Sequence, residues 1–278
     1  MLSTRCVVSD SIASKLCAVV LLLVWCVAGH GSGLAAAQEP EGHVALGGFD
    51  EWRRQPANAA LAWDETLDRY RDHLLKSGLS PEQADRALRL ALAHHEGALY
   101  DKVYAGVPEF QTDPNRLLMQ AVDGRKPGRA LDVGMGQGRN ALALARLGWD
   151  VTGFDVSAVG LAKARAAAAA QGVTIHAVHA ADEEFDFGLD RWDLIALLYA
   201  IEKRSVLRVK AALRPGGLVV VEAAHREASG AEWEFESNEL LRIFEGFKIL
   251  KYEELMGAYD WAPGKPLRMV RLVAQKPD

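Results

Sequence analysis

Two spacings of apolar residues occur along this chain, and the change between them separates a helical part from a later part of strands and helices. From Ala59 to about Lys76, apolar residues recur every three or four positions, which predicts an amphipathic helix. Residues 80–83, Ser-Pro-Glu-Gln, combine an N-cap, a proline at the first helical position and a capping box, so they predict the start of a second helix. Asp113 and Pro114 predict the start of a third helix.

Short apolar runs bounded by turn residues follow from residue 129 onward, and helical patterns separate most of them. The runs that predict strands cover residues 129–133, 151–154, 173–178, 191–199, 218–222, 247–255 and 267–274. Strands that alternate with helices are typical of an α/β fold built around a mostly parallel sheet.

Residues 129–157 have the pattern of a strand, a glycine-rich turn, a helix and a second strand. Gly134, Gly136 and Gly138 stand at every second position of the turn, and glycine leaves room for a ligand against the backbone. A helix that begins after such a turn offers unpaired N–H groups and the positive end of its dipole. Asp155, at the end of the second strand, can accept two hydrogen bonds from a ribose diol. These features together predict a nucleotide-type cofactor site.

The spacing of the glycines separates two kinds of cofactor. Dinucleotide-binding folds use Gly-x-Gly-x-x-Gly, whereas this chain has Gly-x-Gly-x-Gly with an acid, Asp132, two residues before the first glycine. That pattern resembles motif I of the class I S-adenosylmethionine-dependent methyltransferases. Residues 130–157 are most similar to the small-molecule branch of the family, which includes the tellurite-resistance and thiopurine-type enzymes. Residues 213–217, Leu-Arg-Pro-Gly-Gly, resemble a second family motif that ends a helix and turns the chain into a strand.

The resemblance implies that S-adenosylmethionine is the cofactor, and it implies a set of binding residues. Asp132 matches the acid near the amino group of the methionine moiety, Asp155 the acid that binds the ribose, and Asp182 the residue that accepts from the adenine amino group. The remaining cofactor-binding residues belong to the glycine turn and the helix start: Gly134, Gly136, Gly138 and Asn140. A solvated acidic loop is the alternative interpretation of Asp182, because further acidic residues follow it.

The region after the fourth predicted strand bears on the methyl acceptor. Methyltransferases of nucleic-acid bases carry an Asp/Asn-Pro-Pro-Tyr/Phe loop there, and catechol-type enzymes carry a carboxylate for Mg²⁺; this chain has neither before Glu202. Tyr199, expected at the rim of the cleft, and His225, just past the fifth strand, are the catalytic candidates, with His225 as a general base. A solvated loop histidine is the alternative for His225. A soft acceptor such as a thiol would need no strong base. The resemblance to the small-molecule branch implies a small-molecule acceptor, and the missing carboxylate implies no metal ion at this position.

The segment before the first predicted strand adds two weaker candidates. In the family this segment often touches the cofactor and the substrate, so Tyr100 and Tyr104 are site candidates; packing on the core is the alternative. His94 and His95 could suggest a metal ion, but neighbouring residues of a helix point to different faces. We therefore expect no metal site there.

Charge and cysteine content exclude other classes of protein. The 278 residues carry a formal net charge of −5, so no broad basic field is available for nucleic acid. Cys6, Cys17 and Cys26 all lie near the N-terminus, which leaves the rest of the chain without a disulfide or a thiolate metal site.

The N-terminus resembles a secretory signal peptide. Basic residues precede an apolar run from Leu16 to Ala28, which is shorter than the ~20 residues that span a bilayer, and three alanines end at Ala37 as an Ala-x-Ala-like cleavage site. We therefore expect export to the periplasm or the medium. An uncleaved membrane anchor or a start codon further downstream, which would leave the protein cytoplasmic, are the alternatives. Export conflicts with the cytosolic synthesis of S-adenosylmethionine, and the sequence does not resolve this conflict.

The expected organisation is a signal peptide over 1–37, a linker over 38–57, an N-terminal helical cap over 58–125 and a methyltransferase domain over 126–278. The resemblance implies an α/β, Rossmann-like, seven-stranded, mostly parallel sheet with an antiparallel last strand. The expected activity is methyl transfer from S-adenosylmethionine to a small molecule. The alternatives are an exported, non-catalytic binding domain of the same fold and an NAD(P)-dependent oxidoreductase.

Overall fold

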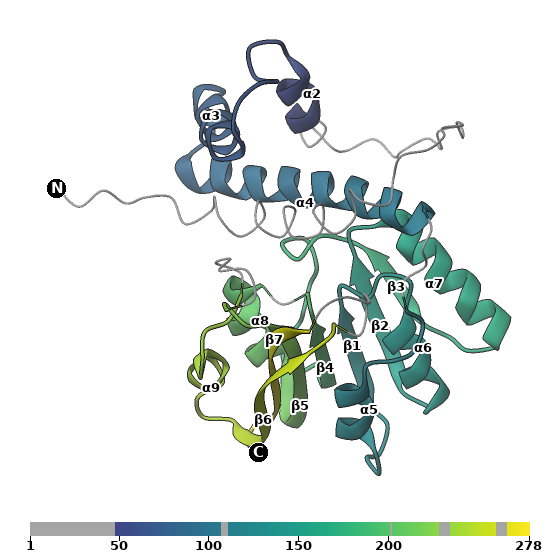
Figure 1. The fold of residues 1–278 in the computed structure, drawn as a ribbon. Helices are drawn as coiled ribbons and strands as arrows, with labels where there is room; N and C mark the ends of the chain where they lie inside the picture. The colour runs from purple at the N-terminus through teal and green to yellow at the C-terminus, as the bar shows by residue number, and fades with distance from the viewer. Residues whose placement is uncertain (1–47, 107–110, 201, 228–233, 260–265) are drawn as a thin grey trace. The chain divides into compact units, whose positions relative to one another are not determined.

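The computed structural model describes residues 48–106, 111–200, 202–227, 234–259 and 266–278 (Figure 1). The predicted signal peptide and the first part of the predicted linker lie outside these residues. Packing within the chain divides it into two compact units, Met1–His95 and Glu96–Asp278. Within the described residues, no helix combines the length and the apolar character needed to cross a membrane.

The first unit is helical. It contains α2 (Gly48–Arg54), α3 (Trp63–Lys76) and the first part of α4 (Pro81–Ala105). The predicted capping box at the start of α4 is confirmed: the Ser80 N–H donates to Gln83 Oε1 at 2.9 Å, and the Gln83 N–H donates to Ser80 Oγ at 3.2 Å. The core of this unit consists of Phe49, Leu67, Tyr70, Leu74, Ala84, Leu88, Ala91 and Leu92.

The predicted linker over 38–57 does not fit the structure after residue 47, because α2 lies within it. Phe49 is only 1% exposed, and its ring packs edge-on against Tyr70, with ring centroids 4.9 Å apart. A helix of seven residues, about two turns, carries too few apolar residues for a periodic pattern, so the packing of α2 on α3 could not be inferred from the sequence. The expected domain boundary at residue 126 also differs from the observed division, since the last turns of α4 belong to the second unit.

The second unit contains the predicted seven-stranded sheet. Its strands are β1 (Arg129–Val133), β2 (Asp150–Asp155), β3 (His176–His179), β4 (Trp192–Leu198), β5 (Leu213–Ala224), β6 (Lys248–Gly257) and β7 (Leu267–Gln275). They are ordered β3-β2-β1-β4-β5-β7-β6. The pairs from β3 to β5 are parallel, and β7 runs antiparallel to both β5 and β6. The predicted fold class is therefore confirmed, including the antiparallel last strand.

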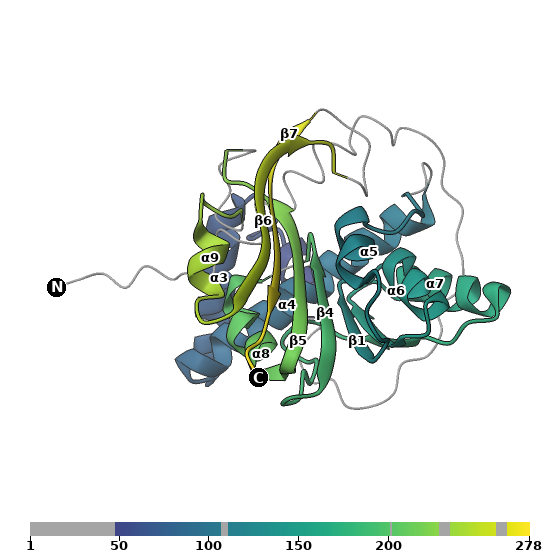
Figure 2. The same ribbon diagram turned by 90° about the horizontal axis from the view of Figure 1, so that it is seen from below.

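Helices cover both faces of this sheet (Figure 2). The helices are α5 (Arg116–Val122), α6 (Arg139–Arg146), α7 (Ala158–Gln171), η1 (Lys203–Ser205), α8 (Val206–Ala212) and α9 (Glu239–Ile243). The first three pack on one face of the sheet around Leu144, Leu161 and Leu194, and α8 and α9 pack on the other around Trp192 and Phe244. Because the sheet is buried on both faces, its central strands are continuous apolar runs.

Two helix starts differ from their predictions. Helix α5 begins after Asn115, whose side chain accepts from the Leu118 N–H and so acts as the N-cap. Serine is a preferred N-cap, so the sequence predicts the cap of the last helix at Ser237; helix α9 instead follows Asn238, and the Ser237 hydroxyl donates to Glu254.

The predicted turn over residues 214–217 is part of β5 instead. Gly216 has a φ of +74° there, and the pairing of β4 with β5 shifts register beside it. The turn-forming residues therefore produce an irregularity in the strand rather than a loop before it.

Candidate active site

The glycine turn between β1 and α6 has the backbone conformation that its sequence predicts. Gly134, Gly136 and Gly138 have φ values of +64°, +53° and +84°, a region that L residues rarely adopt. Neighbouring side chains also exclude a Cβ. At Gly136 it would collide with the hydroxyl of Tyr104, and at Gly138 it would lie 2.9 Å from Ala164 Cβ. Glycine is thus required here by the protein itself, besides any ligand.

Asp155 and the glycine turn are in direct contact. Because β1 and β2 are parallel neighbours, Asp155 at the carboxyl end of β2 lies beside the turn that follows β1. Asp155 Oδ2 accepts from the Gly136 N–H at 2.8 Å, and Oδ1 accepts from the Ser157 N–H at 2.7 Å. Burial raises the pKa of Asp155, and these two bonds oppose that rise. Each carboxylate oxygen can accept a further hydrogen bond, so Asp155 keeps the capacity to bind a ribose diol.

Asp132 and Asn140 lie on the other side of the glycine turn. Asp132 is 1% exposed, and its Oδ2 accepts from the Ala141 N–H at 3.1 Å. Burial raises the pKa of Asp132 to about 7, although the charge of Arg139 lowers it. Asn140 Oδ1 accepts from the Asn115 N–H at 2.8 Å, which ties the first turn of α6 to the start of α5.

Asp182 is placed by α8. Its carboxylate accepts from the Ser205 hydroxyl and, at 2.6 Å, from Arg208 Nη2. Burial raises the pKa of Asp182, and the bond with Ser205 and the charge of Arg208 oppose the rise. Glu183 in the same loop pairs with Arg204 at 2.9 Å. Two acids of this loop, Asp182 and Glu183, are therefore paired with arginines. The simpler interpretation, a solvated acidic loop, did not include these pairs.

Tyr199 belongs to a buried polar cluster at the carboxyl ends of β4 and β5. Its φ is +64°, and its hydroxyl donates to the carboxylate of Glu222, which is fully buried. Glu222 also accepts from Asn115 Nδ2 at 2.9 Å and pairs with Arg271 of β7. A buried carboxylate is stable only when it is paired and hydrogen-bonded in this way.

Three members of this cluster, Asn115, Glu222 and Arg271, are absent from the residues that the sequence singled out. A signal for one of them was available, because Glu222 interrupts the apolar run of β5. A charge in the middle of a buried strand indicates a partner or a function. The identity of its partners was not available, since they lie at the start of α5, just after β4 and on β7.

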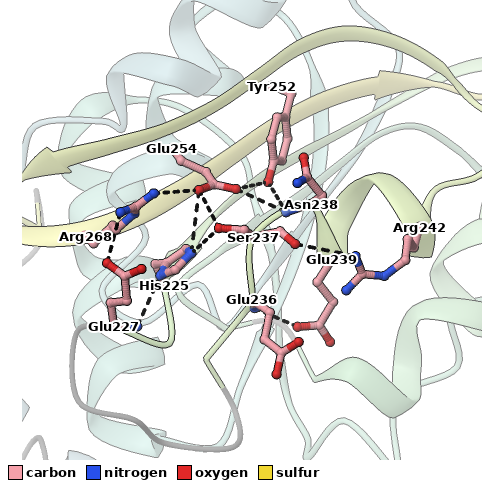
Figure 3. A network of polar contacts seen from close by, with 10 residues as sticks. All are labelled: His225, Glu227, Glu236, Ser237, Asn238, Glu239, Arg242, Tyr252, Glu254 and Arg268. Carbon is pink, nitrogen blue, oxygen red and sulfur yellow. Dashed lines mark hydrogen bonds and ion pairs between the residues drawn. The ribbon is translucent and has the colours of Figure 1, made fainter.

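His225 lies in a second polar network, which Figure 3 shows. It is 3% exposed, so it is not the solvated loop histidine of the simpler interpretation. The Glu227 N–H donates to Nδ1 at 3.1 Å, which leaves the proton on Nε2, 3.1 Å from Ser237 Oγ and 3.6 Å from Glu254 Oε2. A Ser-His-acid triad needs its serine and its carboxylate on opposite ring nitrogens, so this group is not a hydrolase triad.

Glu254 is the centre of that network. It accepts from Tyr252, from Ser237 and from Arg268 of β7. These bonds, that with Tyr252 above all, lower the pKa of Glu254 to about 2. The network therefore joins the end of β5 to the β6–β7 hairpin, and the role of His225 as a general base stays a prediction.

The last turns of α4 border the cofactor half of the site. The ring of Tyr104 lies between Gly136 and Gly160, where it would collide with a Cβ at Gly136 and would lie 3.0 Å from one at Gly160. Burial raises the pKa of Tyr104, and so does the charge of Asp155. Tyr100 packs beside Tyr104, with ring centroids 6.2 Å apart. Both tyrosines thus adjoin the residues predicted to hold the cofactor.

No group of three or more His, Cys, Asp or Glu side chains that could hold a metal ion occurs in the described part of the chain. His95 instead pairs with Asp50 at 2.6 Å within the first unit.

Comparison with known proteins agrees with this geometry. Residues 130–217 match a family described as "Methyltransferase domain". The sheet and its helices resemble the crystal structure of TehB from Haemophilus influenzae, with a TM-score of 0.52 and 21% identity over 65% of this chain and 67% of that chain. The second unit therefore has a Rossmann-like fold, residues 130–217 match a methyltransferase family, and this match implies S-adenosylmethionine as the cofactor.

The chain is also similar in sequence to two curated proteins. The chain is 31% identical over 182 residues to "Hemagglutinin 1" of Eikenella corrodens, covering 60% of each sequence. It is 30% identical over 117 residues to the "Ubiquinone biosynthesis O-methyltransferase" of Cereibacter sphaeroides, covering 38% of this chain and 47% of that one. The chain thus spans only about half to three fifths of the length of the relatives it matches.

The residues present fit S-adenosylmethionine. The turn after β1 has the positive φ values that bring backbone N–H groups forward, and Asp155 retains acceptor capacity beside it. Asp132 lies near the carboxyl end of β1 and Asp182 follows β3, and these two strands flank β2 in the sheet. Ligands of open α/β sheets bind at this edge, outside the carboxyl ends of the strands.

Proposed function

We propose that this protein is an S-adenosylmethionine-dependent methyltransferase that acts on a small-molecule acceptor. The contact between Asp155 and the Gly136 N–H carries the proposal, because it joins the acid that we expect to bind the ribose directly to the glycine turn. The family match over residues 130–217 supports it. The relative named as an O-methyltransferase supports a small-molecule acceptor.

S-adenosylmethionine supplies an activated methyl group, and the protein's part is to bind, orient and exclude water. In this proposal Asp155 holds the ribose, Asp182 meets the adenine amino group, and Asp132 faces the ammonium of the methionine moiety. Tyr199 lies at the end of β4, where the acceptor would approach, and its hydroxyl proton is directed to Glu222. His225 is the candidate base for an acceptor that must lose a proton.

Calorimetric titration of S-adenosylmethionine, and separately of NAD, tests the proposal. Micromolar binding of S-adenosylmethionine without binding of NAD is the expected result. Transfer of a radiolabelled methyl group should then be screened over thiols, phenols, amines and oxyanions. Tight binding of NAD alone would replace the proposal with an oxidoreductase, the alternative that the glycine spacing disfavours.

A non-catalytic role is the second candidate, and the relative named "Hemagglutinin 1" favours it. In that case the domain binds the cofactor and transfers its methyl group to no acceptor in the panel. Agglutination of erythrocytes by the purified protein, with and without Asp155→Ala, would separate the two roles. Agglutination that is unaffected by this substitution would place that activity outside the cofactor site.

We also propose that residues 1–37 direct export and are removed after Ala37, on the basis of the apolar run and the alanines that follow it. N-terminal sequencing of protein from fractionated cells tests this. Mature protein that begins at Gln38 outside the cytoplasm is expected. Protein that keeps its N-terminus in the membrane fraction would indicate an anchor, which is the only membrane association that we propose.

A further inference from the structure

The last two turns of α4 lie directly against the segment that joins β2 to α7. At Gly97 a Cβ would collide with the carbonyl oxygen of Val156, so the helix approaches this backbone as closely as glycine permits. Val156 follows the proposed ribose-binding residue, Asp155. The approach is therefore made at a segment that helps to set where that carboxylate lies, since the Ser157 N–H bonds it.

Asp101 of α4 forms two hydrogen bonds to this segment through one oxygen. Its Oδ1 accepts from the Ser157 hydroxyl at 2.6 Å and from the Val159 N–H at 3.0 Å. Ser157 in turn donates its N–H to Asp155 Oδ1 at 2.7 Å. A continuous chain of hydrogen bonds thus runs from Asp101 through Ser157 to Asp155.

Capping of α7 alone does not account for this arrangement. The hydroxyl of Ser157 already accepts from the Gly160 N–H at 3.0 Å, so α7 has an N-cap of its own. In the cap, the Ser157 hydroxyl only accepts, so its proton remains available for a second hydrogen bond. The carboxylate of Asp101, on the distant helix α4, accepts that proton. The two hydrogen bonds that Asp101 accepts tie the residues on both sides of Ala158 to α4, and one of them, Ser157, supplies the N–H that holds Asp155.

We propose that Asp101 is a positioning residue for the ribose of the cofactor, acting through Ser157 on Asp155. The inference rests on the proposed function, because it concerns the same cofactor. It assigns to α4 a defined task in that site: through Asp101 and Ser157, the helix sets the orientation of the Asp155 carboxylate. Charged hydrogen bonds of this kind are the stronger ones, which suits a contact that must hold a loop in one geometry.

The test measures the affinity of the full chain for S-adenosylhomocysteine and for its 2′-deoxyribose analogue by calorimetry. Asp101→Ala should weaken binding of S-adenosylhomocysteine about tenfold, the loss expected for a hydrogen bond to a charged group. Asp101→Asn should recover part of this loss, since an amide oxygen still accepts. The preference for ribose over deoxyribose should fall in both variants.

A double-mutant cycle shows whether Asp101 acts through Asp155. In an Asp155→Ala background, Asp101→Ala should cost less than about twofold further, because the group that it positions is gone. The matched control is Asp193→Asn. Asp193 likewise accepts from a backbone N–H, that of Arg129, and from a side chain, that of Arg214, but near the amino end of β4. Asp193→Asn should lower Tm without changing the affinity for S-adenosylhomocysteine.

Two results would overturn the inference, and they are distinguishable from failure of the proposed function. If Asp101→Ala lowers Tm but leaves affinity and ribose preference unchanged, Asp101 is a structural cap only. If its effect is equally large in the Asp155→Ala background, it does not act through Asp155. If the parent chain binds neither ligand, the proposed function fails, and the inference fails with it.

Discussion

The two halves of the candidate site are built in different ways. In the cofactor half, Asp155 bonds Gly136 and Ser157, which are 19 and 2 residues away in the sequence. In the half formed by the ends of β4, β5 and β7, Glu222 bonds Asn115 over 107 residues and Arg271 over 49. The first half is a local motif that one strand-turn-helix-strand unit can form. The second exists only when the whole sheet has assembled.

This difference predicts which half loses ligand affinity on substitution and which half loses stability. A local motif with exposed acceptor capacity can lose ligand affinity without losing the fold. A buried ion pair that joins three elements contributes to stability first, because removing one partner leaves an uncompensated group. The four predictions below are ordered from the largest expected effect to the smallest.

Asp132 is the exception in the cofactor half, since its burial should cost stability at neutral pH. Burial raises its pKa from 3.8 to about 7, with Arg139 and the Ala141 N–H opposing the shift and Asp155 adding to it. Folding thus favours the protonated form of Asp132. The contribution of this preference to the free energy of unfolding is fully present below about pH 4 and is lost as the pH rises to about 7. A shift of about three pKa units, at 1.36 kcal/mol per unit, sets an upper limit of about 4 kcal/mol on this loss of stability.

Asp132→Asn should therefore be more stable than the parent at pH 8 and show a shrinking advantage toward pH 4. Urea unfolding of the ligand-free protein across this range measures it. Parallel stability curves for the two proteins would show that Asp132 ionises at its ordinary pKa in the fold.

Glu222→Ala should lower the free energy of unfolding by about 3 kcal/mol, because Arg271 and Asn115 lose the carboxylate that they share. Glu222→Gln should cost less, since its amide oxygen still accepts from Asn115. Urea unfolding measures both. Affinity of the folded Gln variant for S-adenosylmethionine should stay within about twofold of the parent; a larger loss would show that the two halves are coupled.

Asp155→Ala should weaken binding of S-adenosylmethionine by about 1–3 kcal/mol through the loss of charge-assisted hydrogen bonds. Calorimetry at a temperature where the variant is folded measures the effect. Unchanged affinity would remove Asp155 from the ribose site and erase the distinction between the halves.

Tyr199→Phe is the mildest change, because it removes only the hydroxyl that donates to Glu222. It should cost about 1 kcal/mol of stability, reduce methyl transfer to the acceptor and leave cofactor affinity unchanged. Thermal unfolding and calorimetry on the same preparation give the first and third readouts. A drop in cofactor affinity comparable to that of Asp155→Ala would place Tyr199 in the cofactor half.

Much of the cofactor half could be predicted because its information is local. The glycine spacing and the flanking acids lie within one short stretch, and the structure has the positive φ values that the glycines imply. The capping box at Ser80 is encoded in the same way. By contrast, the residues of α2 are predicted as a linker, since a helix of seven residues whose large apolar side chains are Phe49 and Trp52 is too short to show a period.

The sequence by itself determined the strand and helix pattern, the caps and the glycine turn, because each depends on backbone preferences within a few residues. Only the tertiary structure decided that Glu222 has Asn115, Tyr199 and Arg271 as partners, that His225 is buried against Ser237, and that Asp101 reaches Ser157. These contacts join residues that no periodicity relates. Their choice follows from which strands become neighbours and which helices pack on them, and that is settled only when the apolar faces of the sheet are buried.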